Sequence, residues 1–421
     1  MNNNPEQPRE FDVVLGGRNS PPVDSLVLGG IEGVKHRLKS SDIEVRIAAL
    51  AEALNYNKQG LDIVIEILQR APAKLQRLIA RLLREKGGQE GKQFLLNYDP
   101  WLFFTTLEDW NKNELYSEYI TPKSSGIVRA VKTKQQLQNL LQKPNLKKLV
   151  ALVCEMTYDY DDNNHHLGFH YCADALVNAY QQLPNLKALF IGDVEDSEQW
   201  SGGYSDLYIG NISPIFKAFP QLELLHLCGC LDKANKPLLE EQQSQKQEIL
   251  QIRKRDGSTI AREKTKHAQL KTLIIEGSDL TDNHITQLCK LEYPSLEYLE
   301  LWLGRKDTPK IVESLSPIFS AQACPNLLYL GLIGSENTNA IAAAIAKSSI
   351  IKQLKVLALG SGNLSNAGVL ALLDCPAVNN LHTLNVSENR LKPNMLDKLS
   401  QLKCQVIADS QFHDRYYSVW E

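Results

Sequence analysis

The sequence has few cysteines, almost no net charge and no long hydrophobic run. Eight cysteines among 421 residues are too few for a disulfide scaffold, which favours a reducing cytoplasm. The 46 lysines and arginines nearly balance the 49 aspartates and glutamates, which argues against a chain that binds nucleic acid over its whole surface. No apolar run approaches the ~18 residues of a membrane-spanning helix, and residues 1–5 lack the pattern of a signal peptide. We therefore expect a cytoplasmic protein without a membrane segment.

Catalytic motifs are also lacking. The sequence contains no G-x-S-x-G elbow, no H-E-x-x-H pair and no G-x-x-x-x-G-K-[ST] phosphate loop. Residues 87–93 carry glycines and a lysine, but they have neither the spacing nor the hydroxyl of a phosphate loop. We predict a protein that is not an enzyme and that has no catalytic residues, no cofactor and no metal.

What the sequence does contain is a repeat of the pattern L-x-x-L-x-L. From Leu270 onwards the gaps between copies are 26, 31, 27 and 27 residues, close to the ~20–29 residues of a leucine-rich repeat. A weaker copy lies at residues 146–155. The opening leucines of the seven clear copies are Leu186, Leu222, Leu270, Leu296, Leu327, Leu354 and Leu381.

This period predicts an α/β solenoid. Each copy would form a short strand whose two later leucines point into the core, and the segments between strands would form helices. Helix starts are indicated by the capping residue Thr281 and by the pair Thr308 and Pro309. Stacked repeats would make a leucine-rich repeat horseshoe, with a parallel sheet on the concave face and helices on the convex side.

A helical region precedes the repeats. Apolar residues recur at helical period over residues 30–96, with a helix start at Pro72 and a stop at Gly87 and Gly88. We expect a small all-α, HEAT-like domain at 26–97, and we expect the aromatic segment 98–104 to dock it onto the repeats. The predicted divisions are a flexible leader at 1–25, the helical domain at 26–97, an aromatic linker and cap at 98–143, and a leucine-rich repeat domain at 144–421 with a polar insertion at 231–267.

Two stretches resemble known families. Residues from about 11 to 96, with the segments 27–38 and 46–56, resemble a bacterial HEAT-like preamble that precedes various repeat domains. From about residue 144 onwards, Leu299-Glu-Leu-Trp-Leu-Gly and Arg415-Tyr-Tyr-Ser-Val resemble a bacterial ribonuclease-inhibitor-like leucine-rich repeat family. The resemblance implies a bacterial, cytoplasmic binding module and carries no catalytic residue. The insertion at 231–267 departs from the family, so a partner of the family need not be shared.

The repeat pattern also predicts which residues face a partner. In each copy the second and third variable positions, and the residue after the last leucine, lie on the concave face. Aromatic and acidic residues gather there, and aromatic residues dominate binding hot spots. Two alternatives stay open, because an internal loop such as the insertion would cover this face in place of a partner. The predicted partner-binding residues are Phe190, His226, Ile274, Glu276, Tyr298, Glu300, Trp302 and Tyr329.

A second candidate site is basic. Lys74, Arg77, Arg81 and Arg84 follow one another in steps of 3, 4 and 3 residues, which places them on one face of a helix. This secondary basic face predicts a contact with an acidic partner or with nucleic acid phosphates. The simpler interpretation is a solvated helix face.

Residues 158–172 form a third, weaker candidate. They begin like a calcium loop, but Asn164 replaces the glycine and His170 replaces the bidentate glutamate of such a loop. His166, His170 and Cys172 would suit a transition metal, although a plain polar loop explains them as well. The sequence as a whole predicts a non-enzymatic interaction scaffold that binds a protein on its concave face. The alternative is a substrate-presenting or regulatory subunit that acts through its basic helix; neither the partner nor the oligomeric state follows from the sequence.

Overall fold

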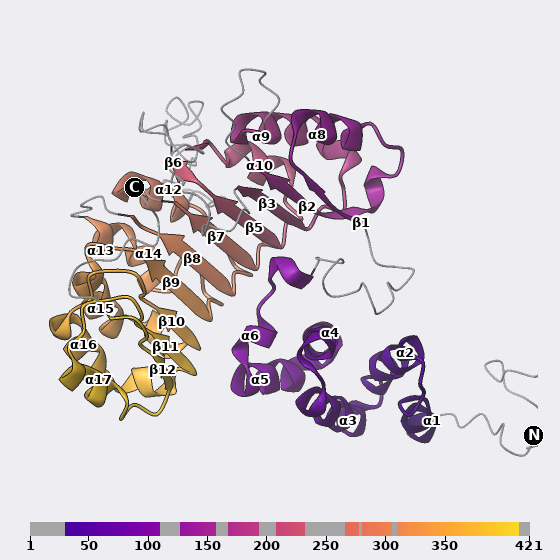
Figure 1. Cartoon of the computed structure of the whole chain (residues 1–421), viewed down its shortest axis with the longest axis horizontal. Helices are drawn as coiled ribbons and strands as arrows, with labels where there is room; N and C mark the ends of the chain where they lie inside the picture. Colours follow the sequence, from indigo (N-terminus) through magenta and orange to yellow (C-terminus); the bar gives the residue numbers. More distant parts are fainter. Residues whose placement is uncertain are drawn as a thin grey trace, which may run out of the picture. The chain divides into compact units, whose positions relative to one another are not determined.

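The computed structural model divides the chain into two compact units, which meet in sequence between Arg70 and Ala71. It describes residues 30–109, 127–156, 167–192, 208–231, 266–277, 280–304 and 310–411. The leader predicted at 1–25 therefore lies outside the described residues, as does nearly all of the insertion predicted at 231–267. Each unit is considered by itself (Figure 1).

The first unit consists of three helices, α1 (Gly30–Arg37), α2 (Ile43–Ala53) and α3 (Asn57–Arg70). Asp42 caps α2 by accepting a hydrogen bond from the backbone N–H of Glu44. Gly60 allows α3 to approach α2 closely, because a Cβ atom there would lie 1.7 Å from the carbonyl oxygen of Ala53. The helical period over this region is confirmed, and its likeness to HEAT repeats stays a prediction.

The second unit begins with helices that the sequence had grouped with those of the first. They are α4 (Ala73–Lys86), α5 (Gly88–Tyr98), α6 (Pro100–Phe103) and the 3-10 helix η1 (Leu107–Asp109). The predicted boundaries are confirmed, because Pro72 is the N-cap of α4 and Gly87 its C-cap. Gly88 follows with a φ of +63°, a conformation that favours glycine. Asp99 then caps α6, with Pro100 at the first helical position.

A parallel sheet of ten strands forms the centre of the second unit. Its order is β1-β2-β3-β5-β7-β8-β9-β10-β11-β12, and every neighbouring pair is parallel. The strands are β1 (Ile127–Val131), β2 (Leu149–Glu155), β3 (Ala188–Gly192), β5 (Leu224–Cys228), β7 (Thr272–Glu276), β8 (Tyr298–Trp302), β9 (Tyr329–Ile333), β10 (Val356–Ala358), β11 (Thr383–Asn385) and β12 (Gln405–Ile407). Two short strands, β4 (Tyr208–Ile209) and β6 (Cys230–Leu231), pair separately.

Helices between the strands cover one face of this sheet (Figure 1). The predicted cap at Thr281 is confirmed, since its hydroxyl accepts from the N–H of His284 in a capping box. The predicted cap at 308–309 lies outside the described residues. The helices are α8 (Lys134–Leu141), α9 (Phe169–Asn178), α10 (Ser213–Ala218), α12 (Asp282–Leu288), α13 (Ile311–Ser314), α14 (Ser316–Phe319), α15 (Thr338–Ala346), α16 (Asn366–Leu373) and α17 (Pro393–Leu399).

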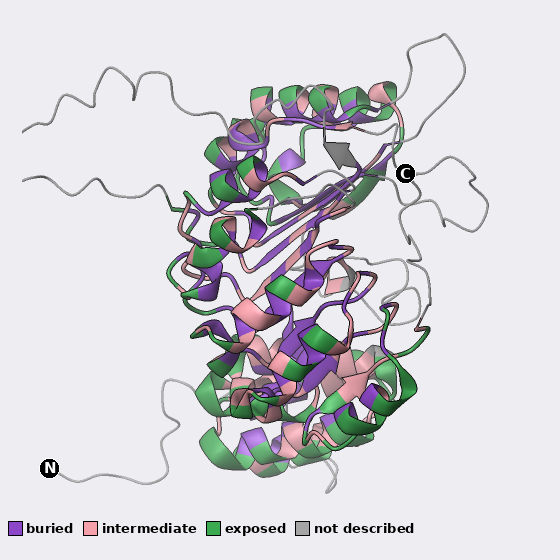
Figure 2. Ribbon diagram, turned by 90° about the vertical axis from the view of Figure 1, so that its left-hand side faces the viewer, coloured by how far each residue is buried: buried purple, intermediate pink, exposed green. Residues whose placement is uncertain are grey.

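The main core lies between the sheet and these helices, where Figure 2 shows buried residues along the strands. The leucine pattern places it there, because alternate residues of a strand point to opposite faces. In β8, for instance, Leu299 and Leu301 are buried in this core, and the opening Leu296 is fully buried. The observed architecture is an α/β solenoid, and the horseshoe curvature stays a prediction.

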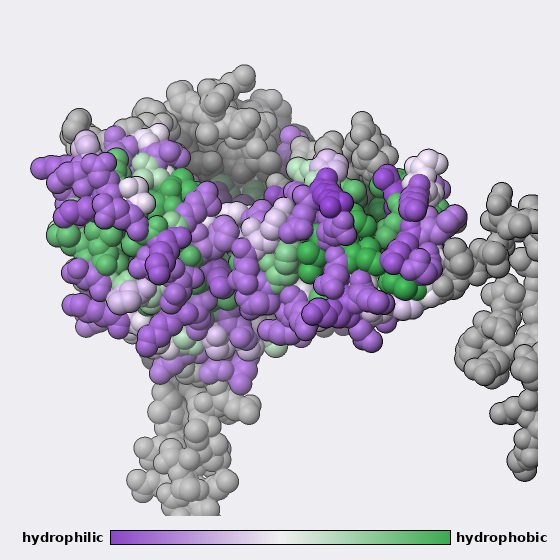
Figure 3. Space-filling model, turned by 90° about the horizontal axis from the view of Figure 1, so that it is seen from below, coloured by the Kyte–Doolittle hydropathy of each residue, from purple (hydrophilic) through white to green (hydrophobic). Residues whose placement is uncertain are grey.

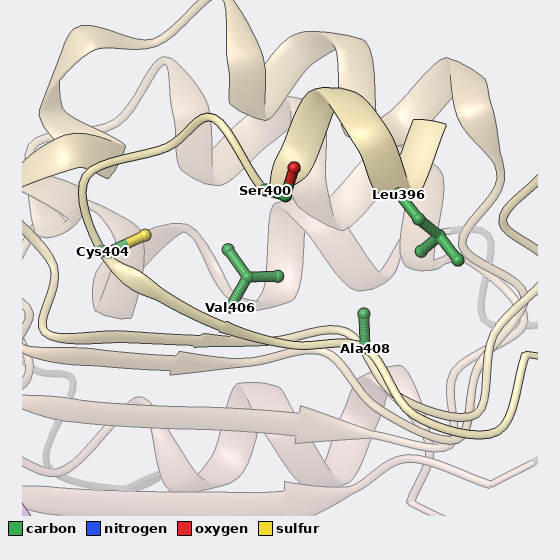
Figure 4. A pocket seen from close by; sticks show the side chains of 5 residues that line it. All are labelled: Leu396, Ser400, Cys404, Val406 and Ala408. Carbon is green, nitrogen blue, oxygen red and sulfur yellow. The ribbon is translucent and has the colours of Figure 1, made fainter. Parts of the chain in front are cut away.

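Two strands extend the sheet beyond the repeats recognised in the sequence. β1 adds an edge before the first copy, and β12 adds one after the last. By the register of β11 with β12, Lys403 and Ala408 occupy the positions of the first and last leucines of a repeat. At this end, a hollow of about 310 Å³ opens beside β12 (Figure 4); it is lined by Leu396, Ser400, Cys404, Val406 and Ala408.

In the view of Figure 3, green hydrophobic patches are separated by hydrophilic residues. Among the helices of the described residues, none combines the length and apolarity that crossing a membrane requires.

Candidate interaction face

The face of the sheet opposite α8–α17, here called the inner face, carries three rows of side chains. Residues paired by the parallel register lie side by side across neighbouring strands, about 4.8 Å apart. The first row is Ala151, Ala188, Leu224, Thr272, Tyr298, Tyr329, Val356 and Thr383. The second is Val153, Phe190, His226, Ile274, Glu300, Gly331, Ala358 and Asn385, and the third includes Glu155, Cys228, Glu276, Trp302 and Ile333.

All eight residues predicted to bind a partner lie in these rows, but their surroundings differ. Tyr298 and Tyr329 belong to the first row, and their rings stack with centroids 3.8 Å apart and planes 3° from parallel. Tyr329 is buried, whereas Trp302 and Ile274 are half-buried. Phe190 is buried as well.

A segment of the chain itself covers the first row. We call residues 100–107 the strap. At one end, the ring of Trp101 meets Tyr329 edge-on at 5.6 Å. Phe104 packs edge-on against both tyrosines, at 5.4 Å from Tyr298 and 5.8 Å from Tyr329, and is only 1% exposed. Two residues of the segment 98–104, Trp101 and Phe104, thus contact the sheet, while its role in docking the whole domain predicted at 26–97 stays a prediction.

The strap continues across the strands towards β2. The backbone carbonyl of Thr105 accepts a 2.6 Å hydrogen bond from the hydroxyl of Thr272 on β7. Leu107 then packs against the small apolar cluster of Ala151, Ala188 and Leu224 on β2, β3 and β5. The strap therefore runs roughly perpendicular to the strands and occupies the first row from β9 to β2.

This packing changes the part that Tyr298 and Tyr329 play. The sequence predicts that both tyrosines anchor a partner. In the structure, however, Phe104 already packs against both rings and Trp101 packs against that of Tyr329. Burial raises the pKa of both phenols, and the negative charge of Glu300 raises it further. They remain neutral hydrogen-bond donors that hold the strap and Glu300 in place.

Residues of the predicted basic face also contact the strap and Asp109, which lies just after it. Arg84 donates two hydrogen bonds of 2.9 Å to the carboxylate of Asp109 and one of 3.0 Å to the carbonyl of Phe103. Only 12% of the Arg84 side chain and 9% of the Asp109 side chain are exposed. The steps of 3 and 4 residues indicate one helix face, and Arg84 on that face bonds to residues 103 and 109; the contact with an acidic partner stays a prediction.

The two neighbouring arginines, Arg77 and Arg81, contact the same segment. Arg77 lies within 3.4 Å of the hydroxyl of Thr106, and Arg81 donates to the carbonyl of Asp109 at 3.3 Å. Arg81 also pairs with Glu85 on its own helix. The side chain of Lys74 lies outside the described residues. The sequence did not indicate these contacts, because the acceptors of the arginines lie about 25 residues further along the chain and share no local pattern with them.

The second and third rows, in contrast, carry polar groups that the strap leaves uncovered. Glu300 accepts hydrogen bonds from the hydroxyls of Tyr298 at 2.8 Å and Tyr329 at 2.6 Å, and from the indole N–H of Trp302 at 2.8 Å. Both carboxylate oxygens are thereby oriented by neutral donors. Trp302 is held in turn, so its indole has a fixed position on the inner face.

A second polar group lies on β5 and β7. The Nε2 atom of His226 is 3.0 Å from the carboxylate of Glu276, and the imidazole meets the ring of Phe190 edge-on at 4.7 Å. Burial alone would raise the pKa of Glu276, but hydrogen bonds from His226 and Cys228 outweigh it and lower that pKa. Glu276 is therefore ionised near neutral pH. The two side chains keep 18% and 29% of their exposure.

The candidate loop at 158–172 is only partly described, since residues 157–166 lie outside the described residues. Cys172 sits in α9 and is buried against the thiol of Cys154. The hydrogen bond from Cys172, followed by burial, raises the pKa of Cys154. Cys172 thus faces the core. Within the described ranges, no three His, Cys, Asp or Glu side chains are arranged to hold a metal.

Comparison with known proteins supports the fold. No family model matches the chain, and no curated protein matches it. A crystal structure of a protein from Bacteroides fragilis is similar with a TM-score of 0.51 at 22% identity, over 67% of this chain and 71% of that one. An internalin from Listeria monocytogenes is similar at 16% identity, over 64% of this chain and 63% of that one, with a TM-score of 0.28 that is too low to support an argument. The strand pattern, the parallel sheet and the first of these structures together identify the fold as an α/β solenoid of the leucine-rich repeat type.

Proposed function

We propose that this protein is a non-enzymatic interaction scaffold that binds a polypeptide partner on its inner face, beside the strap. The observation that supports this is the contrast between rows. The first row is filled by the strap, while the second and third rows keep half-buried residues of mixed character on three adjacent strands. These are His226, Ile274, Glu276, Glu300 and Trp302.

Their composition suits a protein partner. Binding hot spots favour tryptophan surrounded by groups that exclude water, and Trp302 is flanked by Ile333 in the register of β8 with β9. The side chains that would meet the partner come from rigid strands, so little conformational entropy is lost on binding. The strap supplies a wall along one side of the surface.

A capture experiment tests this proposal. The double variant Ile274→Asp and Trp302→Ala changes the open rows and leaves Phe104 and its tyrosines in place. The matched control is Tyr180→Ala, which removes an aromatic ring that is 45% exposed away from this face. Chemical cross-linking in cell extract, followed by quantitative mass spectrometry, should show a protein bound by wild type and by the control but lost from the double variant. Equal capture by all three folded proteins would contradict the proposal.

The cytoplasmic location, the bacterial origin and the absence of catalysis belong to this proposal as predictions from the sequence. A contact with an acidic partner through the basic helix has less support, because Arg77, Arg81 and Arg84 all bond to residues 103–109.

A further inference from the structure

We propose that the inner face receives an arginine side chain of the partner, stacked on the indole of Trp302 and paired with the carboxylates of Glu276 and Glu300. This inference rests on the proposed function and adds the chemistry of the partner. It starts from the open sheet face beside the strap and from its unbalanced charge.

The charge of the inner face is uniformly negative apart from a histidine. Along the three rows given above, the charged residues are Glu155, Glu276 and Glu300, and none is lysine or arginine. Glu155 is neutralised by Lys132, at 2.6 Å. Among the described residues, neither Glu276 nor Glu300 has a lysine or arginine partner.

At the opposite edge of the same strands, by comparison, a carboxylate is paired with two lysines. Glu223 lies just before β5 and is held between Lys187 at 2.8 Å and Lys271 at 2.7 Å. Burial raises the pKa of Glu223, but hydrogen bonds from these two lysines outweigh it and lower that pKa. Pairing with lysine is therefore complete for Glu223, whereas among the described residues Glu276 is paired only with His226 and Glu300 only with neutral donors.

The geometry of the open rows fits a planar cation. Ile274 and Glu300 are paired across β7 and β8, so the next inner position, Glu276, lies beside Trp302. Neighbouring strands are about 4.8 Å apart, so the half-buried indole of Trp302 lies beside Glu276 on β7, and it lies two residues along its own strand from Glu300, to which its N–H bonds. An arginine guanidinium can stack on an indole and donate to a carboxylate at the same time.

Hydrogen bonds within the inner face already hold the carboxylates of Glu276 and Glu300 in fixed orientations. The oxygens of Glu300 are held by three neutral donors, and Glu276 is oriented by His226. Neither side chain must lose much rotational freedom on binding, which removes one of the usual costs of an ion pair at a surface. Lysine would gain the charge interaction but would lack the stacking of a planar group.

The test uses the full-length chain labelled with 5-fluorotryptophan, with Trp302→Phe to assign the fluorine signal of Trp302 among the five tryptophans. Three acetylated hexapeptides are titrated: hexa-arginine, hexa-lysine and hexa-citrulline, the last having the shape of arginine without its charge. Hexa-arginine should shift the Trp302 signal saturably, hexa-lysine should bind about fivefold more weakly and hexa-citrulline should give no saturable shift. Equal shifts with arginine and citrulline, or no shift with arginine, would overturn the inference.

Two isosteric variants localise the charge. Glu300→Gln and Glu276→Gln should each weaken hexa-arginine binding by roughly fivefold, while the matched control Glu155→Gln, already neutralised by Lys132, should leave it unchanged. The second of these variants keeps the test decisive if the first disturbs the tyrosines. The capture experiment is read separately. Capture that depends on the inner face without arginine binding rejects only this inference, and arginine binding without such capture rejects the proposed function.

Discussion

Replacement of Phe104 by alanine tests the central claim about the strap. The Phe104 ring is only 1% exposed and lies edge-on to four other aromatic rings, those of Trp101, Phe103, Tyr298 and Tyr329. No other residue of the strap has so many aromatic neighbours among the described residues. If the strap is a stably packed part of the unit, the Phe104 side chain is its principal anchor.

The size of the effect follows from these contacts. Truncation of a buried phenylalanine to alanine costs about 3–5 kcal/mol, and each edge-to-face aromatic pair adds about 0.5–1.5 kcal/mol beyond the area that is buried. With four such pairs, we expect Phe104→Ala to lie near the upper end, at about 4–5 kcal/mol. The loss should appear first as release of the strap, because the sheet keeps its main core on the other face.

Hydrogen exchange measured by mass spectrometry can detect the release of the strap separately from global unfolding. Peptides that cover residues 100–109 should exchange much faster in Phe104→Ala, and urea unfolding should give the total loss. The control is Tyr98→Ala, an aromatic residue that is 37% exposed and that stacks, among the described residues, on Phe94 alone; its cost should stay below about 1.5 kcal/mol. Unchanged exchange at 100–109, together with a loss below about 1 kcal/mol, would refute the anchoring role of Phe104.

Three further predictions concern buried groups elsewhere. Asp109→Ala leaves Arg84 buried without its carboxylate and should cost about 3–5 kcal/mol in urea unfolding, whereas a cost near zero would mean that the pair is solvated. Gly60→Ala places a Cβ atom against the carbonyl of Ala53 and should destabilise the first unit by about 1–3 kcal/mol; limited proteolysis should then cut within residues 30–70 first, and simultaneous cutting of both units would contradict this. Burial lowers the pKa of His267, offset in part by nearby backbone carbonyls, so the unfolded chain binds the proton more readily. Stability should therefore fall as the pH drops below about 6.5, and the urea midpoints of wild type and His267→Phe at pH 7 and pH 5 should show a smaller fall in the variant.

The fold could be predicted from the sequence wherever it depends on a local period. The leucine pattern gave both the strands and their faces, because alternation along a strand is a property of a few neighbouring residues. The eighth copy, weak in sequence, is the strand β2. β1 and β12 were not predicted, since the leucines of the pattern are missing there, as Lys403 and Ala408 illustrate.

The candidate site could be predicted only in part, for the opposite reason. The inner positions of Tyr298 and Tyr329 followed from the pattern, but their contact with Phe104 joins residues about 200 positions apart, and no period records such a contact. The aromatic segment 98–104 did indicate docking, although not the face on which it docks. The arginine stripe likewise indicated a helix face without showing that Asp109 would bury it.

The strap also sets an order of events during synthesis of the chain. Phe104 leaves the ribosome 225 residues before Tyr329, the far tyrosine against which it packs. At about 5–20 residues per second, translation needs roughly 10–45 s to cover that distance. The earlier repeats can stack on one another as they emerge, and the strap can contact β2 to β8, but its packing on Tyr329 requires β9. Its docking is therefore completed only when β9 has formed, and a chain stopped before β9 would lack the contacts of Trp101 and Phe104 with Tyr329.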